Sequence, residues 1–260
     1  MKTRILLIFI SLSTLAFGQT KEGKYSSKNF NTWSLGIDVG NVYVLGDLSS
    51  FASSKTGFEL GFSGNLTKSF TSGLGLKAQV GAGNLSGSHV EDDLMFEGDY
   101  KTIALMLQLN LSNLTLTGRK VDRGVGILLD LGVGGISFKS SKYNLTTGDF
   151  IESTGVPAGS ETRDWYMTAG LMGKFRLTEK VSFTVGSQAN ILIPNDQLDA
   201  VTDATFNGNQ SDMYFYSYMG FSINLGEKRQ SLEWTNPLDE MALEVEEISE
   251  KIEGMTNDMD

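Results

Sequence analysis

The sequence predicts an all-β fold: an eight-stranded antiparallel transmembrane β-barrel with a C-terminal periplasmic amphipathic helix. Three observations predict it. Apolar residues alternate with small or polar ones in eight segments, the polar set carries charges near mid-segment, and long and short connections alternate. With 30 Gly, 3 Pro and no Cys in 260 residues, the chain has the composition of a turn-rich β-protein without disulfides. The lack of Cys also excludes a thiol nucleophile and a Cys-ligated metal site.

The N-terminus has the pattern of a secretion signal. Lys2 and Arg4 form a basic start, residues 5–10 begin an apolar stretch, and the Ala-Phe-Gly of residues 16–18 provides a cleavage pattern. We therefore expect a signal peptide over 1–18. The alternative is an uncleaved membrane anchor, for which the apolar stretch is short, since a spanning helix needs about 20 apolar residues.

After a short periplasmic segment over residues 19–29, the barrel is expected to occupy residues 30–226. Its segments alternate with a period of two, which is the strand period. The eight alternating segments are 33–40, 58–63, 74–81, 103–111, 125–134, 165–176, 181–191 and 215–225.

Alternation alone does not separate a membrane barrel from a soluble sandwich or a lipocalin-like barrel, because all three alternate. The polar residues at mid-strand favour the membrane barrel, in which apolar side chains face lipid and polar ones face the lumen. Many glycines on the polar face fit a narrow lumen. The polar set is Asp38, Glu59, Lys77, Gln79, Gln108, Asp130, Lys174, Arg176, Gln188 and Asn190.

The connections alternate in length, as they do in outer-membrane barrels, which have short periplasmic turns and long external loops. Long gaps are expected at about 42–56, 85–99, 139–162 and 194–211, with shorter ones between them. This alternation places both termini in the periplasm of a Gram-negative bacterium. Aromatic residues at the segment ends could form interfacial girdles: Trp33, Tyr100, Phe138, Trp165, Phe175, Tyr214 and Tyr218.

An eight-stranded lumen is narrow enough for side chains to fill it. Its inward charges have both signs, and unpaired buried charges are costly, so we predict an ion-paired plug and no wide pore. Asp130 and Lys174, on neighbouring strands, are the expected contact. A gated ion path is the alternative. The candidate ion-pair residues are Asp38, Glu59, Lys77, Asp130, Lys174 and Arg176.

The single His, His89, has serines and acids close by in an expected loop. Residues in one loop do not make a triad, whose members come from separate rigid elements. We therefore expect no catalytic residue and no enzyme activity. The loops carry no recognisable metal-ligand spacing, so no metal and no cofactor are expected.

The net charge of −10 is concentrated in the tail, since residues 227–260 contain 11 acidic and 3 basic residues. Neither part of the chain offers the basic face that nucleic acid requires. Asn236 and Pro237 begin a predicted helix, as a cap and a first-turn residue, and Gly254 is a plausible stop. One apolar stripe follows the helix and is expected to dock on something: Leu238, Met241, Val245, Ile248, Ile252 and Met255.

The stretches "GFSINLG", "WTNPLDE" and "GMTNDMD" follow one another at the end of the barrel. In this layout the chain resembles the OmpA family of the Bacteroidota. The resemblance implies that the linker over 227–260 leads to Asp-rich calcium-binding repeats and a peptidoglycan-binding domain beyond residue 260. Calcium is therefore expected only in those repeats, and no peptidoglycan-binding residue falls within this chain.

The expected function is that of a structural outer-membrane anchor that tethers the membrane to peptidoglycan through the missing domain. Its partners would be outer-membrane lipid and lipopolysaccharide, peptidoglycan and other outer-membrane proteins. Two alternatives stay open. The chain could be an accessory subunit of an outer-membrane assembly or secretion complex, or a small porin or barrel enzyme.

Overall fold

The computed structural model describes residues 30–45, 59–90, 92–114, 124–154, 159–193, 198, 212–228 and 230–234, together with 245, 248, 249 and 252. The predicted signal peptide and segment 19–29 lie outside this part of the chain. The elements are β1 (Trp33–Leu45), β2 (Glu59–Ser69), β3 (Leu74–His89), β4 (Leu94–Asn110), α2 (Leu111–Leu114), β5 (Val125–Asn144), β6 (Phe150–Ser153), β7 (Thr162–Arg176), β8 (Val181–Ile193) and β9 (Met213–Leu225).

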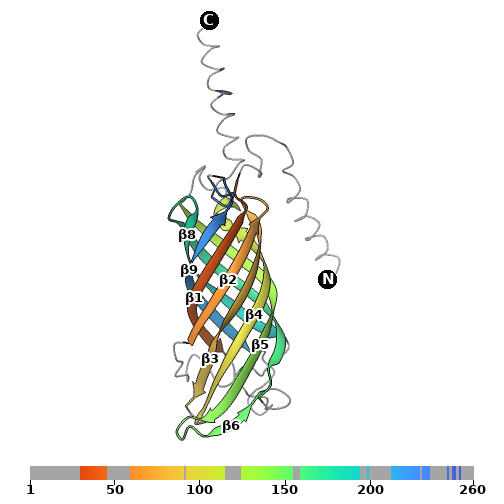
Figure 1. The fold of residues 1–260 in the computed structure, drawn as a ribbon, viewed down its shortest axis with the longest axis vertical. Helices are drawn as coiled ribbons and strands as arrows, with labels where there is room; N and C mark the ends of the chain where they lie inside the picture. Colours follow the sequence, from red (N-terminus) through yellow and green to blue (C-terminus); the bar gives the residue numbers. More distant parts are fainter. Residues whose placement is uncertain are drawn as a thin grey trace, which may run out of the picture.

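Eight of these strands close into an antiparallel barrel, which confirms the predicted all-β, eight-stranded barrel (Figure 1). The predicted C-terminal periplasmic helix is not supported, since only residues 245, 248, 249 and 252 of it are described. Neighbouring strands pair in chain order, β9 pairs with β1, and the short β6 is added to the outer part of β5. Trp33 lies opposite Leu225, so the chain enters and leaves the barrel at one end. We call this end the terminal end and the other the far end.

The strand register fixes the width of the barrel. If directly paired residues are followed from strand to strand around the barrel, the path starts at Trp33 on β1 and returns to β1 at Tyr43, ten residues further along. The strands are therefore strongly tilted relative to the barrel axis. Eight tilted strands leave an interior that side chains can fill. The path runs through Trp33, Lys68, Leu76, Leu107, Leu131, Ala169, Ala189, Phe215 and Tyr43.

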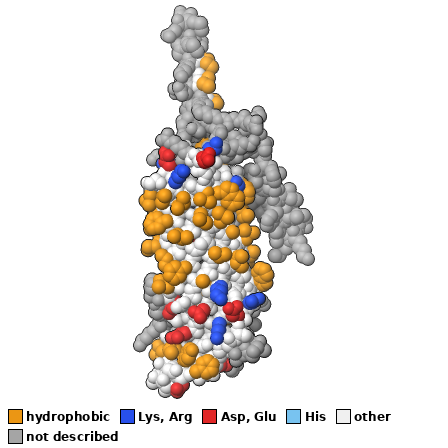
Figure 2. All heavy atoms as spheres, viewed as in Figure 1, with side chains coloured by type: hydrophobic (Ala, Val, Ile, Leu, Met, Phe, Trp, Pro, Cys, Tyr) orange, Lys and Arg blue, Asp and Glu red, His pale blue; other side chains and the backbone are white. Residues whose placement is uncertain are grey.

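The half of the barrel toward the terminal end is apolar outside and polar inside. Ile37 is 68% exposed, whereas its neighbour Asp38 is buried. Figure 2 shows the resulting band of apolar side chains on one face of the barrel, and the exposed apolar residues of the other strands continue it; we call this band the apolar belt. Its exposed members include Leu35, Ile37, Val39, Phe62, Val80, Ile103, Leu105, Val125, Ile127, Val133, Met167, Leu171, Met219, Phe221 and Ile223. Water-soluble proteins rarely expose apolar patches of this extent.

Toward the far end the pattern inverts. Leu85, Phe96 and Phe138 are buried inside, whereas Asp99 and Lys139 are exposed. The expected long loops over 85–99 and 139–162 are therefore partly wrong. The first is a continuation of β3 and β4 joined by a tight turn, and β5 runs on to Asn144.

The expected aromatic girdle is wrong for four of its seven members. Tyr100, Phe138, Tyr214 and Tyr218 are buried, because each occupies an inward position on its strand. Trp33, Trp165 and Phe175 are exposed on the outer face. Within the described residues, no helix is long and apolar enough to cross a membrane.

Three residues of the predicted C-terminal stripe fall within the described residues. Val245, Ile248 and Ile252 are helical and 65%, 57% and 56% exposed. Leu238, Met241 and Met255 lie outside the described residues.

Candidate functional site

The middle of the lumen contains a buried ion pair. Lys77 Nζ donates to Asp130 Oδ2 at 2.9 Å, and Gln108 Nε2 donates to Asp130 Oδ1, also at 2.9 Å. Gln108 lies directly opposite Asp130 on β4, and Lys77 reaches the carboxylate from β3, one strand further on. Lys77 and Asp130 are both 1% exposed. Each oxygen of the carboxylate thus has a donor, which is what a buried charge requires.

Asp38, on the opposite wall, is satisfied by neutral donors. Its carboxylate accepts hydrogen bonds from Asn65 Nδ2 at 2.8 Å, Thr184 Oγ1 at 3.1 Å and Ser63 Oγ at 3.2 Å. Gly220 faces Asp38 across the β1–β9 pair, and a Cβ there would lie 2.2 Å from Asp38 Oδ1. The glycine therefore provides the space that the carboxylate fills.

The expected contact between Asp130 and Lys174 is wrong. Both are inward residues on the neighbouring strands β5 and β7, but Asp130 pairs with Gly170, and Lys174 with Gly126. Four residues along a strand correspond to about 13 Å, which is beyond the reach of a direct contact.

Lys174 instead pairs with a residue that follows the barrel. Its Nζ lies 2.8 Å from both carboxylate oxygens of Glu233, and both side chains are buried. The backbone carbonyl of Glu233 accepts hydrogen bonds from Asn110 Nδ2 and Asn113 Nδ2, each at 3.0 Å. Residues 231–234, Ser-Leu-Glu-Trp, are all buried in the terminal mouth of the barrel, and we call them the mouth plug.

The segment just before β1 holds the mouth plug in place. Asn31 N donates to the Gln230 carbonyl, Leu232 N donates to the Asn31 carbonyl, both at 2.9 Å, and Asn31 forms a parallel bridge with Ser231. The Trp234 ring lies 6.0 Å from the Arg176 guanidinium carbon, measured to the ring centroid. The chain ends that flank the barrel are therefore joined at its terminal mouth.

Between these polar contacts and the far end, the lumen is filled by rings and aliphatic side chains. Tyr214 contacts Tyr100 and Tyr166, with ring centroids 5.6 and 6.2 Å apart, and Tyr216 stacks on Tyr218. The cavity between these rings and Gln79 is only about 10 Å³, roughly the room for one water molecule. Nearer the far end the lumen is packed with Val42, Val44, Leu85, Phe96, Phe138, Leu192 and Leu198. The described lumen is thus closed at several levels.

The remaining sequence candidates lie apart from these contacts. Glu59 accepts a hydrogen bond from Ser86 Oγ at 2.6 Å near the far end. His89 Nδ1 lies 2.8 Å from Asp92 Oδ2 beside the β3–β4 turn. In the part of the chain that the structure describes, no group of three or more metal-binding side chains is found. A polar, closed lumen can hold the barrel together.

The sequence predicts a periplasmic linker and helix over residues 227–260, so the mouth plug at 231–234 is not predicted from it. A signal was present, since Leu232 and Trp234 are large apolar residues on either side of an acid, within nine residues of the last strand.

No protein-family model matches the sequence, and no curated protein matches it. Among solved structures, the chain is similar to the attachment invasion locus protein of Yersinia pestis, with 11% identity, a TM-score of 0.41, and coverage of 74% of this chain and 99% of that chain. It is also similar to the N-terminal β-barrel domain of OprF from Pseudomonas aeruginosa, with 11% identity, a TM-score of 0.39, and coverage of 75% and 98%. It is similar as well to a major outer membrane protein from Thermus thermophilus, with 12% identity, a TM-score of 0.44, and coverage of 74% of this chain and 98% of that chain. At these identities and TM-scores the likenesses carry no argument about function.

Proposed function

We propose that the chain is a structural β-barrel of the outer membrane of a Gram-negative bacterium, which anchors its C-terminal extension at the periplasmic mouth. The apolar belt supports membrane insertion, because a barrel that is apolar outside and polar inside suits lipid and not water. The observation that carries the anchor function is the burial of residues 231–234 in the terminal mouth, with Glu233 held by Lys174.

The proposed orientation follows from the turns. The terminal-end turns over 70–73 and 177–180 are short, as periplasmic turns are in outer-membrane barrels, whereas the far-end connections over 46–58 and 194–212 are long. The β3–β4 turn is the one short far-end connection between the eight described barrel strands. A polypeptide that follows residue 234 would then start in the periplasm, and the buried ion pair of Lys174 with Glu233 would fix its start to the barrel. The finer proposal, from the resemblance of residues 234–260, is a tether to peptidoglycan through a domain beyond residue 260.

The chain has no Cys, so single cysteines can report this orientation without background. Asp149→Cys lies at the far end and Lys180→Cys in a terminal-end turn, and both side chains are exposed. In intact cells, a membrane-impermeant maleimide should label the first and should label the second only after the outer membrane is permeabilised. The reverse pattern would refute the orientation, and equal labelling of both in intact cells would refute the membrane location.

The tether can be tested on the protein expressed from its own gene. If it carries a peptidoglycan-binding domain, the detergent-extracted protein should sediment with purified sacculi. Protein that stays in the supernatant would contradict the tether and leave the anchored barrel standing.

A second candidate is an accessory subunit of an outer-membrane complex. It is favoured by the exposure of Val245, Ile248 and Ile252 on one helical stripe, because an exposed apolar stripe suits a partner. Pull-down of stable outer-membrane partners that is lost on deletion of residues 236–260 would support it, and unchanged capture would exclude the stripe as the docking surface.

A further inference from the structure

A row of polar side chains crosses three strands where the apolar belt ends. Lys101 on β4 pairs directly with Ser137 on β5, and Ser137 pairs directly with Arg163 on β7. All three residues occupy outward positions, and both cations are exposed. One step toward the terminal end, the outer face is apolar. The row therefore lies at the level where a lipid headgroup meets its acyl chains.

A hollow lies next to this row, on the side toward the terminal end. The next outward set is Ile103, Gly135 and Trp165, paired across the same three strands. Ile103 and Trp165 are 64% and 69% exposed, and Gly135 leaves a gap between them. A Cβ at Gly135 would meet nothing closer than 3.8 Å. The hollow has a volume of about 420 Å³, with apolar sides and the two cations at its rim.

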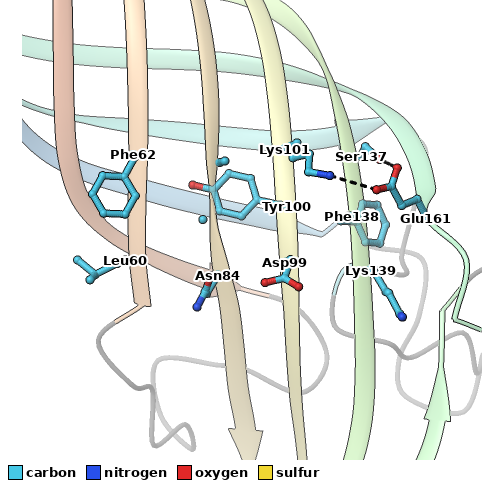
Figure 3. A pocket seen from close by; sticks show the side chains of 12 residues that line it. Leu60, Phe62, Asn84, Asp99, Tyr100, Lys101, Ser137, Phe138, Lys139 and Glu161 are labelled. Carbon is cyan, nitrogen blue, oxygen red and sulfur yellow. Dashed lines mark hydrogen bonds and ion pairs between the residues drawn. The ribbon is translucent and has the colours of Figure 1, made fainter.

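The position of an anion on the row is marked by Glu161. Its carboxylate accepts hydrogen bonds from Ser137 Oγ at 3.0 Å and Lys101 Nζ at 3.3 Å, as Figure 3 shows for the lysine. Glu161 precedes β7, and its side chain is 48% exposed. A second hollow of about 560 Å³, with Leu60 and Phe62 at its apolar side, shares these contacts (Figure 3).

We propose that the row Lys101–Ser137–Arg163 and the hollow at Gly135 bind a phosphate-bearing lipid of the outer leaflet. The phosphate accepts hydrogen bonds from the lysine, the serine and the arginine, in place of the Glu161 carboxylate, because phosphate oxygens accept strong charge-assisted bonds from both cations. The first acyl chain lies against Gly135, between Ile103 and Trp165. This inference rests on the membrane location proposed above and not on the peptidoglycan tether.

The test is lipid retention by the purified full chain in detergent, measured by native mass spectrometry. The probes are diphosphoryl lipid A, the same lipid without its phosphates, and inorganic phosphate. Lys101→Ala with Arg163→Ala should lower lipid retention roughly tenfold, because two charge-assisted hydrogen bonds are lost. Gly135→Ile, which fills the hollow, should lower it as well.

Matched controls separate the site from general effects of charge and surface shape. Lys180→Ala removes an exposed cation at the terminal end, and Gly64→Ile fills an outward position on β2 whose Cβ would approach only Val80, at 3.8 Å. Neither should change retention. Glu161→Ala should raise retention, because the competing carboxylate is removed, whereas Glu152→Ala should raise it less.

Equal retention by the charge variant and the wild type would overturn the proposal. Equal retention of the dephosphorylated lipid would overturn the headgroup assignment, and full competition by inorganic phosphate would reduce the site to a simple anion site. If Gly135→Ile does not fold, Gly135→Ala and the charge variant decide the outcome. Since retention is measured in detergent, a negative result leaves the labelling test of membrane location intact.

Discussion

Lys174 and Glu233 join the barrel wall to the chain that leaves it. Lys174 Nζ lies 2.8 Å from both carboxylate oxygens of Glu233, although the residues are 59 positions apart in sequence. Because both side chains are buried, each needs the other: removal of one leaves an uncompensated charge in the mouth. The mouth plug is therefore a docked part of the fold and not a free linker.

Glu233→Ala should release the mouth plug. The variant leaves the buried charge of Lys174 without a partner. The barrel does not have to unfold in response, because undocking of the plug exposes this charge to water at a smaller cost in free energy. In a background of Trp33→Phe and Trp165→Phe, the fluorescence of Trp234 should shift to the red and become more accessible to acrylamide.

Glu227→Ala, an exposed acid just after the last strand, is the matched control and should leave the emission of Trp234 unchanged. Unchanged emission in Glu233→Ala itself would show that the ion pair does not hold the plug.

Lys77→Met should destabilise the barrel by about 3–5 kcal/mol, the usual cost of leaving a buried charge without its partner. The double variant Lys77→Met, Asp130→Leu should recover most of this loss, because no charge is then left unpaired. Urea unfolding in lipid vesicles measures both values. Additive losses in the double variant would contradict a direct interaction between the two side chains.

Gly220→Ala should destabilise the barrel by roughly 1–3 kcal/mol or prevent its folding, because overpacking displaces neighbours. The new Cβ would lie 2.2 Å from both Asp38 Oδ1 and the Ile37 carbonyl oxygen. Gly64→Ala, with its nearest atom at 3.8 Å, is the control and should be tolerated. Equal stability of both variants by the same urea assay would refute the tight fit around Asp38.

The hydrogen bonds from Ser137 and Lys101 lower the pKa of Glu161 below its ordinary value. A lowered pKa means that the contact is fully present above the ordinary pKa of a Glu carboxyl and is lost as the pH falls through the lowered value. In a carboxyl-carbon NMR titration, Ser137→Ala should raise the pKa of Glu161, whereas Ser141→Ala, further along β5, should not. An unchanged pKa in Ser137→Ala would show that the serine does not hold the carboxylate.

The barrel itself was predictable from sequence, because apolar and polar residues alternate over each segment. The strand extensions toward the far end were not, because beyond the apolar belt the polarity of the two faces inverts. Leu85 and Phe96 then point inward, and Asn84 and Asp99 outward. A prediction that looks for apolar residues at outward positions therefore assigns such a strand extension to a loop.

Four of the six predicted lumen charges are buried, namely Asp38, Lys77, Asp130 and Lys174, but which charges pair was not predictable. Asp130 and Lys174 are both buried, as expected for inward residues, but which charges meet depends on the stagger between strands. That stagger places Lys77 beside Asp130 across β4 and leaves Lys174 for Glu233. Alternation in a single sequence carries no information on stagger.

Single-channel recording of the purified full chain in a planar bilayer tests the central claim most directly, namely that the barrel is a closed structural anchor. The ion pair of Lys77 with Asp130, the tyrosine layer and the mouth plug predict that no stable conductance is seen. Stable, large openings from the correctly folded chain would contradict the closed lumen and favour a porin.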